Sequence, residues 1–171
     1  MSSILHSPPL FFLSGWRFTF LPCLVYIECC SDYPDKLQLD NIRHNARLNL
    51  NADELKNFHV VGHEWGSPVA PLLELSVSTS DHAPGFDLVV MADLIYKASL
   101  HTELLQSASR SLAVDERARI LVSWDKNNQP EETPVSFLAM AERAPHYLFE
   151  EPSTRVEIGD VTTVALQRQI P

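Results

Sequence analysis

The chain has 171 residues, of which 45% are hydrophobic and 20% are charged, and its formal net charge is −9. This composition is typical of one folded domain with a buried core, and it argues against intrinsic disorder. The 13 lysine and arginine residues are scattered singly rather than gathered in a stripe. The sequence therefore shows no basic stripe that would bind phosphate backbones, and we expect no nucleic-acid partner.

Residues 1–22 are expected to form an irregular apolar lead. Their apolar runs are short and are interrupted by Pro8, Pro9, Arg17 and Pro22, so they suit neither a membrane span nor a signal peptide. We expect no membrane association. The alternative is that this lead anchors a secreted or membrane-associated interaction protein.

The cysteines and histidines predict no metal site. Cys23, Cys29 and Cys30 form an odd set without a C-x-x-C pair, which argues against a disulfide framework and a thiolate site. His59 and His63 would share one face of a helix, but in the strand expected there they would lie about 13 Å apart. The cysteine pattern is most simply explained by a reducing compartment, and we expect a cytoplasmic protein.

Residues 23–171 are expected to form one domain in which apolar runs alternate with helical stripes. The expected elements are a strand over Cys23–Cys30, a helix over Asp35–Leu50 capped by Asp35, a strand over Phe58–Trp65, a short helix from Pro68 to Leu75, a strand over Phe86–Ala92, a helix with the stripe Leu100, Leu104, Leu105, Ala108 and Leu112, a strand over Ala118–Trp124 and a helix over Pro134–Arg143. Such alternation predicts a parallel sheet with right-handed crossovers and helices on both faces.

The C-terminal residues have a different pattern. Tyr147–Glu150 is expected to be a short strand, and Thr154–Ile158 and Thr162–Gln167 flank Gly159-Asp160 as the strands of an antiparallel hairpin would. The predicted fold is therefore α/β, with a doubly wound, mostly parallel sheet that ends in an antiparallel hairpin.

Three of the predicted strands are followed by groups suited to ligand binding: Asp32, then Trp65-Gly66, then Asp93 with Tyr96. An open α/β sheet binds its ligand beyond the carboxyl ends of its strands, so these groups are expected to converge. Asp32 could accept from ribose hydroxyls, Trp65 could cover an adenine ring, and Asp93 with Tyr96 could enclose an amine. Each group also has a purely structural explanation. Asp32 could form a turn or cap a helix, Trp65-Gly66 could be a core tryptophan with its turn glycine, and Asp93 with Tyr96 could be a helix cap with a packed tyrosine.

Together these motifs resemble one family. The resemblance rests on four segments of this chain: Asp32-Tyr33-Pro34-Asp35, Asn41-Ile42-Arg43-His44-Asn45, Gly62-His63-Glu64-Trp65-Gly66 and Phe86-Asp87-Leu88-Val89-Val90-Met91-Ala92-Asp93-Leu94-Ile95-Tyr96. They resemble class I, Rossmann-like methyltransferases that use S-adenosyl-L-methionine, within family 16 and its nicotinamide N-methyltransferase-like branch, and the resemblance extends from about Val25 to Ser123. It implies cofactor binding by Asp32, Trp65, Gly66 and Ala92, with Asp93 and Tyr96 at the methyl-transfer end.

The resemblance also implies a reaction and its acceptors. Members of this branch transfer methyl groups to a protein N-terminus, a lysine or a small amine, and some act on translation elongation factor 1-alpha. Such a transfer needs no covalent intermediate. The family opens with a strand and a glycine-rich turn, whereas Ser14-Gly15-Trp16 follows no strand signal and Gly15 is the only glycine before Gly62. We therefore expect an N-terminally incomplete sheet and impaired catalysis. The missing strand belongs between the strands that precede Asp32 and Asp93, and the alternative is that the segment from Leu10 to Leu21 partly fills this gap. The alternative is a non-catalytic or truncated relative that acts as a binding module.

Overall fold

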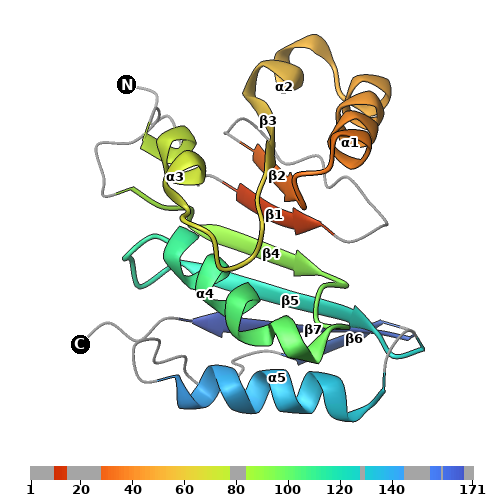
Figure 1. Ribbon diagram of the computed structural model, residues 1–171, viewed down its shortest axis with the longest axis vertical. Coiled ribbons are helices and arrows are strands. Elements are labelled where there is room, and N and C mark those ends of the chain that lie inside the picture. Colours follow the sequence, from red (N-terminus) through yellow and green to blue (C-terminus); the bar gives the residue numbers. More distant parts are fainter. Residues whose placement is uncertain are drawn as a thin grey trace, which may run out of the picture.

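The described residues form a seven-stranded sheet in the order β3-β2-β1-β4-β5-β7-β6 (Figure 1). The structure is a computed structural model, and it describes residues 10–14, 28–77, 84–127, 130–144, 155–158 and 160–167. The strands are β1 Leu10–Ser14, β2 Glu28–Asp32, β3 Phe58–Gly62, β4 Leu88–Ala92, β5 Arg119–Asp125, β6 Arg155–Ile158 and β7 Val161–Gln167. All pairs from β3 to β5 are parallel, and β7 is antiparallel to both β5 and β6. The predicted parallel sheet with a C-terminal hairpin is confirmed.

Strand β1 corrects one expectation. It lies within residues 1–22, which we expected to be irregular, and it pairs in parallel with β2 on one side and β4 on the other. It thus lies between the strands that lead to Asp32 and to Asp93. Its sequence, Leu-Phe-Phe-Leu-Ser, is short but β-favouring, and two neighbouring ladders pair its backbone. Residues 15–27, including Gly15, lie outside the described part, so the expectation about the glycine-rich turn is not tested.

The described helices agree with the predicted stripes, with one addition. They are α1 Lys36–Asn49, α2 Ala52–Asn57, α3 Ala70–Val77, the 3-10 helix η1 Ala98–Leu100, α4 His101–Ser111 and α5 Glu132–Arg143. Asp35 caps α1 as predicted, because its side chain accepts from the backbone N–H groups of Leu37 and Gln38. The sequence patterns did not predict α2, whose N-terminus is a capping box between Asn51 and Glu54. None of the described helices is long and apolar enough to cross a bilayer.

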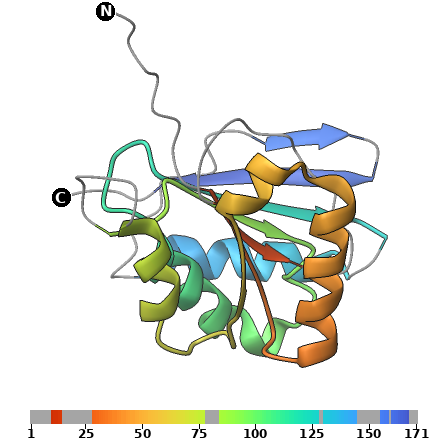
Figure 2. The same ribbon diagram turned by 90° about the horizontal axis from the view of Figure 1, so that it is seen from above.

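The main core lies on one face of the sheet. Alternate side chains of β4, β5 and β7 are fully or almost fully buried there: Val89, Met91, Ile120, Val122, Trp124, Val164 and Leu166. Buried residues of α4 and α5, including Leu104, Ala108 and Phe137, belong to the same cluster, and both helices lie along this face in Figure 2. The helical stripe that predicted α4 is therefore its core-facing side.

Helix α1 covers the opposite face. Cys29 belongs to the main core, whereas Cys30, the next residue in β2, is buried outside it, as are Ile42 and Ala46 of α1. Successive side chains in a strand point to opposite faces, so α1 lies on the other side of the sheet from α4 and α5. Helices therefore cover both faces, as predicted.

Strand boundaries differ from the predictions by a few residues. Phe58–Trp65 ends as a strand at Gly62, because a turn follows in which the Ser67 N–H donates to the Glu64 carbonyl. β2 begins at Glu28, and the earlier part of the predicted strand lies outside the described residues, as does Tyr147–Glu150.

Candidate functional site

The carboxyl ends of the parallel strands lie level with one another. Asp32 pairs with Gly62 across β2 and β3, and Ala92 pairs with Ser14 across β4 and β1 and with Ser123 across β4 and β5. β1 separates β2 from β4, so two strand spacings place the Asp32 and Ala92 backbones about 10 Å apart. The predicted site residues of the three strand ends therefore share one edge of the sheet.

Asp32 ends β2 and is half-buried. Its Oδ1 accepts a hydrogen bond from the backbone N–H of Tyr33 over 2.7 Å, and its carbonyl accepts from the His63 N–H over 2.8 Å. The second bond ties the loop after β2 to the loop after β3. The same loops also meet at Gly62, where an ideal Cβ would lie 2.9 Å from Pro34 Cβ.

The loop after β3 carries Trp65 and Gly66 and is fixed to α4. Trp65 is partly buried against the main core. Gly66 has φ +86°, which disfavours a side chain, and its N–H donates to Ser107 Oγ of α4 over 2.8 Å. An ideal Cβ on Gly66 would lie 3.1 Å from Glu103 Cγ. Glycine is therefore favoured here both by the backbone conformation and by the close approach of α4.

His63 completes this attachment. Its Nε2 lies 2.9 Å from Ser107 Oγ, and its side chain is 5% exposed. Burial lowers the pKa of His63 below its ordinary value, because a charged imidazole would lose hydration there. Burial therefore favours the neutral imidazole. His63 connects Asp32, through its backbone N–H, to Ser107, through its ring, and Ser107 in turn accepts from Gly66.

Asp93 directly follows β4 in a strained conformation. Its φ is +54°, in the left-handed region that few residues other than glycine, asparagine and aspartate adopt. Its N–H donates to the Ser123 carbonyl over 2.9 Å, and its Oδ1 accepts from the Asp125 N–H, also over 2.9 Å. Such strain is concentrated at functional sites, and these two bonds hold it in place.

The rest of the Asp93–Tyr96 motif has one exposed member. Leu94 and Ile95 are buried in the core, whereas Tyr96 is 60% exposed. His101 fixes this turn, because its Nε2 lies 2.8 Å from the Ile95 carbonyl, which can only accept. The imidazole also makes an edge-to-face contact with Phe137 of α5, with ring centroids 5.1 Å apart.

The structure thus brings Asp32, Gly62–Gly66, Ala92 and Asp93 to one edge of the sheet, with Tyr96 on the surface close by in sequence. The sequence patterns did not single out His63, Ser107 and His101 as partners of this edge. Ser107 had a signal, since it is a polar residue inside the apolar stripe of α4. The identity of its partners depends on the tertiary structure alone.

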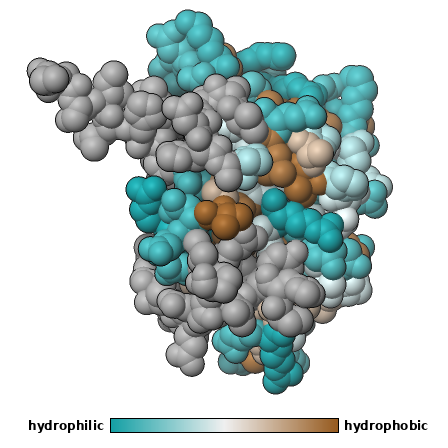
Figure 3. Space-filling model, turned by 90° about the vertical axis from the view of Figure 1, so that its left-hand side faces the viewer, coloured by the Kyte–Doolittle hydropathy of each residue, from teal (hydrophilic) through white to brown (hydrophobic). Residues whose placement is uncertain are grey.

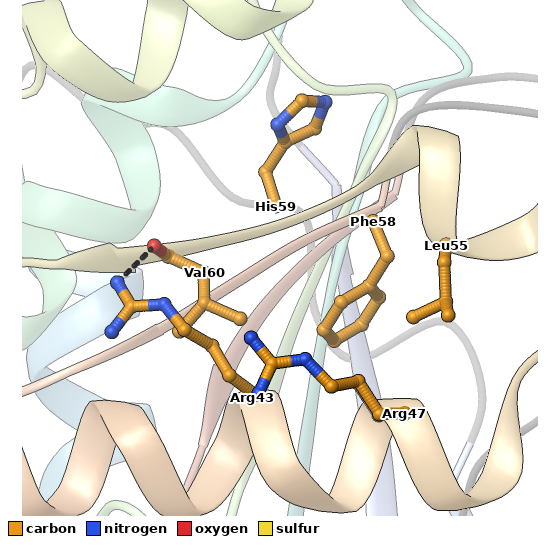
Figure 4. A pocket seen from close by; sticks show the side chains of 7 residues that line it. Arg43, Arg47, Leu55, Phe58, His59 and Val60 are labelled. Atoms are coloured by element: carbon orange, nitrogen blue, oxygen red, sulfur yellow. Dashed lines mark hydrogen bonds between the residues drawn. The ribbon is translucent and has the colours of Figure 1, made fainter.

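A groove with a volume of about 330 Å³ lies elsewhere, between α1, α2 and β3 (Figure 4). Phe58 and Val60 point toward α1, whereas His59 points away from it, and Arg43 Nη2 donates to the Val60 carbonyl over 3.2 Å. None of the predicted site residues lines this groove. We therefore do not assign it to the candidate site.

Two further observations concern potential metal ligands and the surface. Within the described residues, no group of three or more potential metal ligands comes together. Figure 3 views the molecule from the side of the amino ends of β1, β4 and β5, and the coloured surface there is mostly hydrophilic with small apolar areas.

No protein-family model matches the chain. Among curated proteins, a protein N-terminal and lysine N-methyltransferase of Emericella nidulans, efm7, is 35% identical over 95 residues, which are 54% of this chain and 36% of that protein. The chain thus spans about a third of the length of this relative.

Solved structures of methyltransferases share the fold. The dimethyltransferase RosA from Streptomyces davawensis superimposes with a TM-score of 0.62 at 13% identity, covering 94% of this chain and 49% of RosA. The O-methyltransferase NcsB1, solved in complex with S-adenosylmethionine, gives a TM-score of 0.51 at 9% identity, covering 84% of this chain and 42% of NcsB1. The chain therefore has the Rossmann-like methyltransferase fold.

Proposed function

We propose that this chain carries an S-adenosylmethionine-dependent N-methyltransferase site at the carboxyl edge of its sheet. The observation that carries the proposal is the level alignment of Asp32, Gly62 and Ala92 at the carboxyl ends of β2, β3 and β4, on either side of β1. Ligands of open α/β sheets bind at this edge, beside the point where the strand order reverses. That point is β1. From β1 the chain continues outward through β2 and β3, and it then returns to β4 on the other side of β1.

The residues at this edge suit the cofactor. Asp32 would bind the ribose, since its half-buried carboxylate is held by the Tyr33 N–H. Trp65 would lie by the adenine, and its loop is fixed on α4 through Gly66. Ala92 ends β4 with a small side chain, and it would contact the cofactor there. When bound, S-adenosylmethionine supplies a methyl group on a sulfonium that an amine lone pair can attack.

The chain's own residues would then orient the amine. Asp93 would accept a hydrogen bond from the amine, and its Oδ1 is positioned by the Asp125 N–H. Tyr96, exposed beside this turn, would enclose the acceptor. Proximity and orientation supply much of the rate in such a transfer, because no covalent enzyme intermediate is needed.

The acceptor class follows from the relatives and the charge. The efm7 protein of Emericella nidulans is named for methylation of protein N-termini and lysines. A net charge of −9 also favours a basic substrate. We propose a protein amine as the acceptor, with translation elongation factor 1-alpha as the first protein to test, a small amine as the second choice, and the cytoplasm as the place of action. The Asp93–Tyr96 motif further supports the family 16 assignment.

A methyl-transfer assay tests the proposal. The chain is incubated with radiolabelled S-adenosylmethionine and peptides that carry a free N-terminus and lysines. We expect label in the peptide amines, reduced about tenfold or more in Asp93→Asn, which keeps an acceptor for the Asp125 N–H but loses the charge. Glu142→Gln, at an exposed position of α5, should retain the activity of the original chain.

Two outcomes would count against parts of this proposal. Equal transfer by Asp93→Asn would remove Asp93 from the methyl-transfer end. Tight binding of S-adenosylhomocysteine without any transfer would favour the non-catalytic binding module instead.

A further inference from the structure

Glu103 has a buried carboxylate oxygen that lacks a partner. Its Oε2 is inaccessible to solvent and makes no hydrogen bond with any described residue, although the residue as a whole is partly exposed. A buried carboxylate oxygen without a donor is costly, so such an atom calls for an explanation. A ligand that donates a hydrogen bond provides one.

The position of Glu103 relates it to the candidate site. Glu103 and Ser107 are four residues apart in α4, so they lie on the same face of the helix, one turn from each other. Ser107 contacts the loop after β3 through His63 and Gly66, and Glu103 contacts the same loop at Gly66. Both side chains therefore face the loop that carries Trp65.

Glu103 is also the nearer of the two to the carboxyl edge. Helix α4 begins soon after the Asp93–Tyr96 turn, and it ends where the Ser111 carbonyl accepts from the Phe86 N–H, ahead of β4. It therefore runs away from the edge, and Glu103 lies about 6 Å closer to that edge than Ser107 does. Its terminal torsion has a broad energy minimum, so the carboxylate can turn toward a ligand there.

We propose that Glu103 accepts a hydrogen bond from the exocyclic amino group of the cofactor's adenine and so determines the specificity for this nucleobase. The inference rests on the proposed function. Asp32 lies at the ribose end, Trp65 offers a flat face to the ring, and Glu103 supplies an acceptor beside Gly66. A side chain at Gly66 would press on Glu103, because an ideal Cβ there would lie 3.1 Å from Glu103 Cγ.

Another carboxylate in the same loop provides the rival assignment. Glu64 directly precedes Trp65, but it is exposed. An exposed carboxylate is hydrated, and it therefore discriminates weakly between a donor and an acceptor on the base. The buried oxygen of Glu103 discriminates strongly, because an unsuitable base leaves it unpaired.

Calorimetric titrations with two nucleosides test the assignment. S-inosylhomocysteine differs from S-adenosylhomocysteine in that a carbonyl oxygen replaces the amino donor at C6, and N1 changes from an acceptor to an N–H donor. The chain should prefer the adenosyl compound about 10- to 100-fold, and Glu103→Gln should reduce this ratio to within about threefold, because an amide can also donate to the carbonyl. Glu64→Gln and the surface control Glu142→Gln should keep the original ratio.

The ratio of the affinities for the adenosyl and inosyl compounds separates a specificity role from a structural one. A purely structural role of Glu103 would weaken both affinities equally and leave their ratio unchanged, which would overturn the inference. A reduced ratio in Glu64→Gln would also overturn the inference. If Glu103→Gln does not fold, Glu103→Asp, which keeps the charge but withdraws it by one methylene, must reduce the ratio. If the original chain binds neither compound, the proposed function itself fails.

Discussion

The carboxylate of Asp93 accepts a hydrogen bond from the backbone N–H of Asp125, 32 residues later in the chain, over 2.9 Å. This bond joins the end of β4 to the end of β5 at the point where Asp93 takes a positive φ. Asp93 therefore stabilises the fold as well as being a candidate for the methyl-transfer end. A loss of activity in a variant at this position has to be separated from a loss of structure.

Substitutions of Asp93 separate the two roles. Asp93→Ala removes the acceptor and places alanine in the left-handed region, so the free energy of unfolding should fall by about 2–4 kcal/mol. Asp93→Asn keeps an acceptor and tolerates this φ, so its loss should stay below about 1.5 kcal/mol. Urea unfolding measures both values. Equal losses in the two variants would mean that the bond to Asp125 contributes little.

Two glycines with positive φ should differ in their tolerance of alanine. On Gly85 an ideal Cβ would lie 2.5 Å from Ala113 Cα, a backbone atom, whereas on Gly66 it would lie 3.1 Å from the flexible side chain of Glu103. Gly66→Ala should cost about 1–2 kcal/mol from its φ, and Gly85→Ala should cost more because the Ala113 backbone cannot move aside. Thermal unfolding of both variants checks this order, which the reverse ranking would contradict.

Stability should depend on pH through His63. Its pKa in the folded state lies below the ordinary 6.5, so between these two values the unfolded chain binds a proton that the folded chain does not. The stabilisation from neutral His63 is therefore complete above pH 6.5 and is lost as the pH falls from 6.5 toward the folded-state value. Ser107 and the Asp32 carbonyl are its hydrogen-bonding neighbours, and Glu64 and Glu103 are the carboxylates on the adjoining loop and helix.

Urea midpoints at about pH 7.5, 6.5 and 5.5 measure this dependence. His63→Asn should flatten the decline on the acid side relative to the original chain. His44→Asn, at an exposed position of α1, should leave the decline unchanged. An identical decline in the original chain and in His63→Asn would show that other groups cause it.

His101 should be needed as a hydrogen-bond donor rather than only as a ring. His101→Phe keeps an aromatic contact with Phe137 but leaves the Ile95 carbonyl unpaired, so it should cost about 1–3 kcal/mol. His101→Gln can still donate, so it should cost less. Urea unfolding compares them, and a His101→Phe variant as stable as the original chain would refute the role of this bond.

The sequence patterns predicted the elements whose apolar spacing is long or regular. The stripe from Leu100 to Leu112 predicted α4, and the continuous run Phe86–Ala92 predicted β4, because each buries a face that the pattern already defines. Helix α2 was missed since it has no buried residue, although its capping box is visible in the sequence. Strand β1 was missed because its few residues stand within a longer apolar segment, and only pairing with both β2 and β4 distinguishes it.

The candidate site was predictable only in part. The places of Asp32, Trp65 and Asp93 after apolar runs predicted that they share an edge, because parallel strands align their carboxyl ends. Their partners were not predictable: Ser107 lies 44 residues from His63, and Asp125 lies 32 residues from Asp93. Such contacts depend on how α4 and β5 pack, which no local pattern encodes.

The most direct test of the proposed site is calorimetric titration of the chain with S-adenosylhomocysteine. We expect one saturable site, and we expect Asp32→Ala to weaken it about ten- to a hundredfold, because the ribose loses a charged acceptor. Asp53→Ala, at an exposed position of α2, which leads into the amino end of β3, should bind like the original chain. No binding by the original chain, or equal affinity in Asp32→Ala, would contradict a cofactor site at the carboxyl ends of β2, β1 and β4.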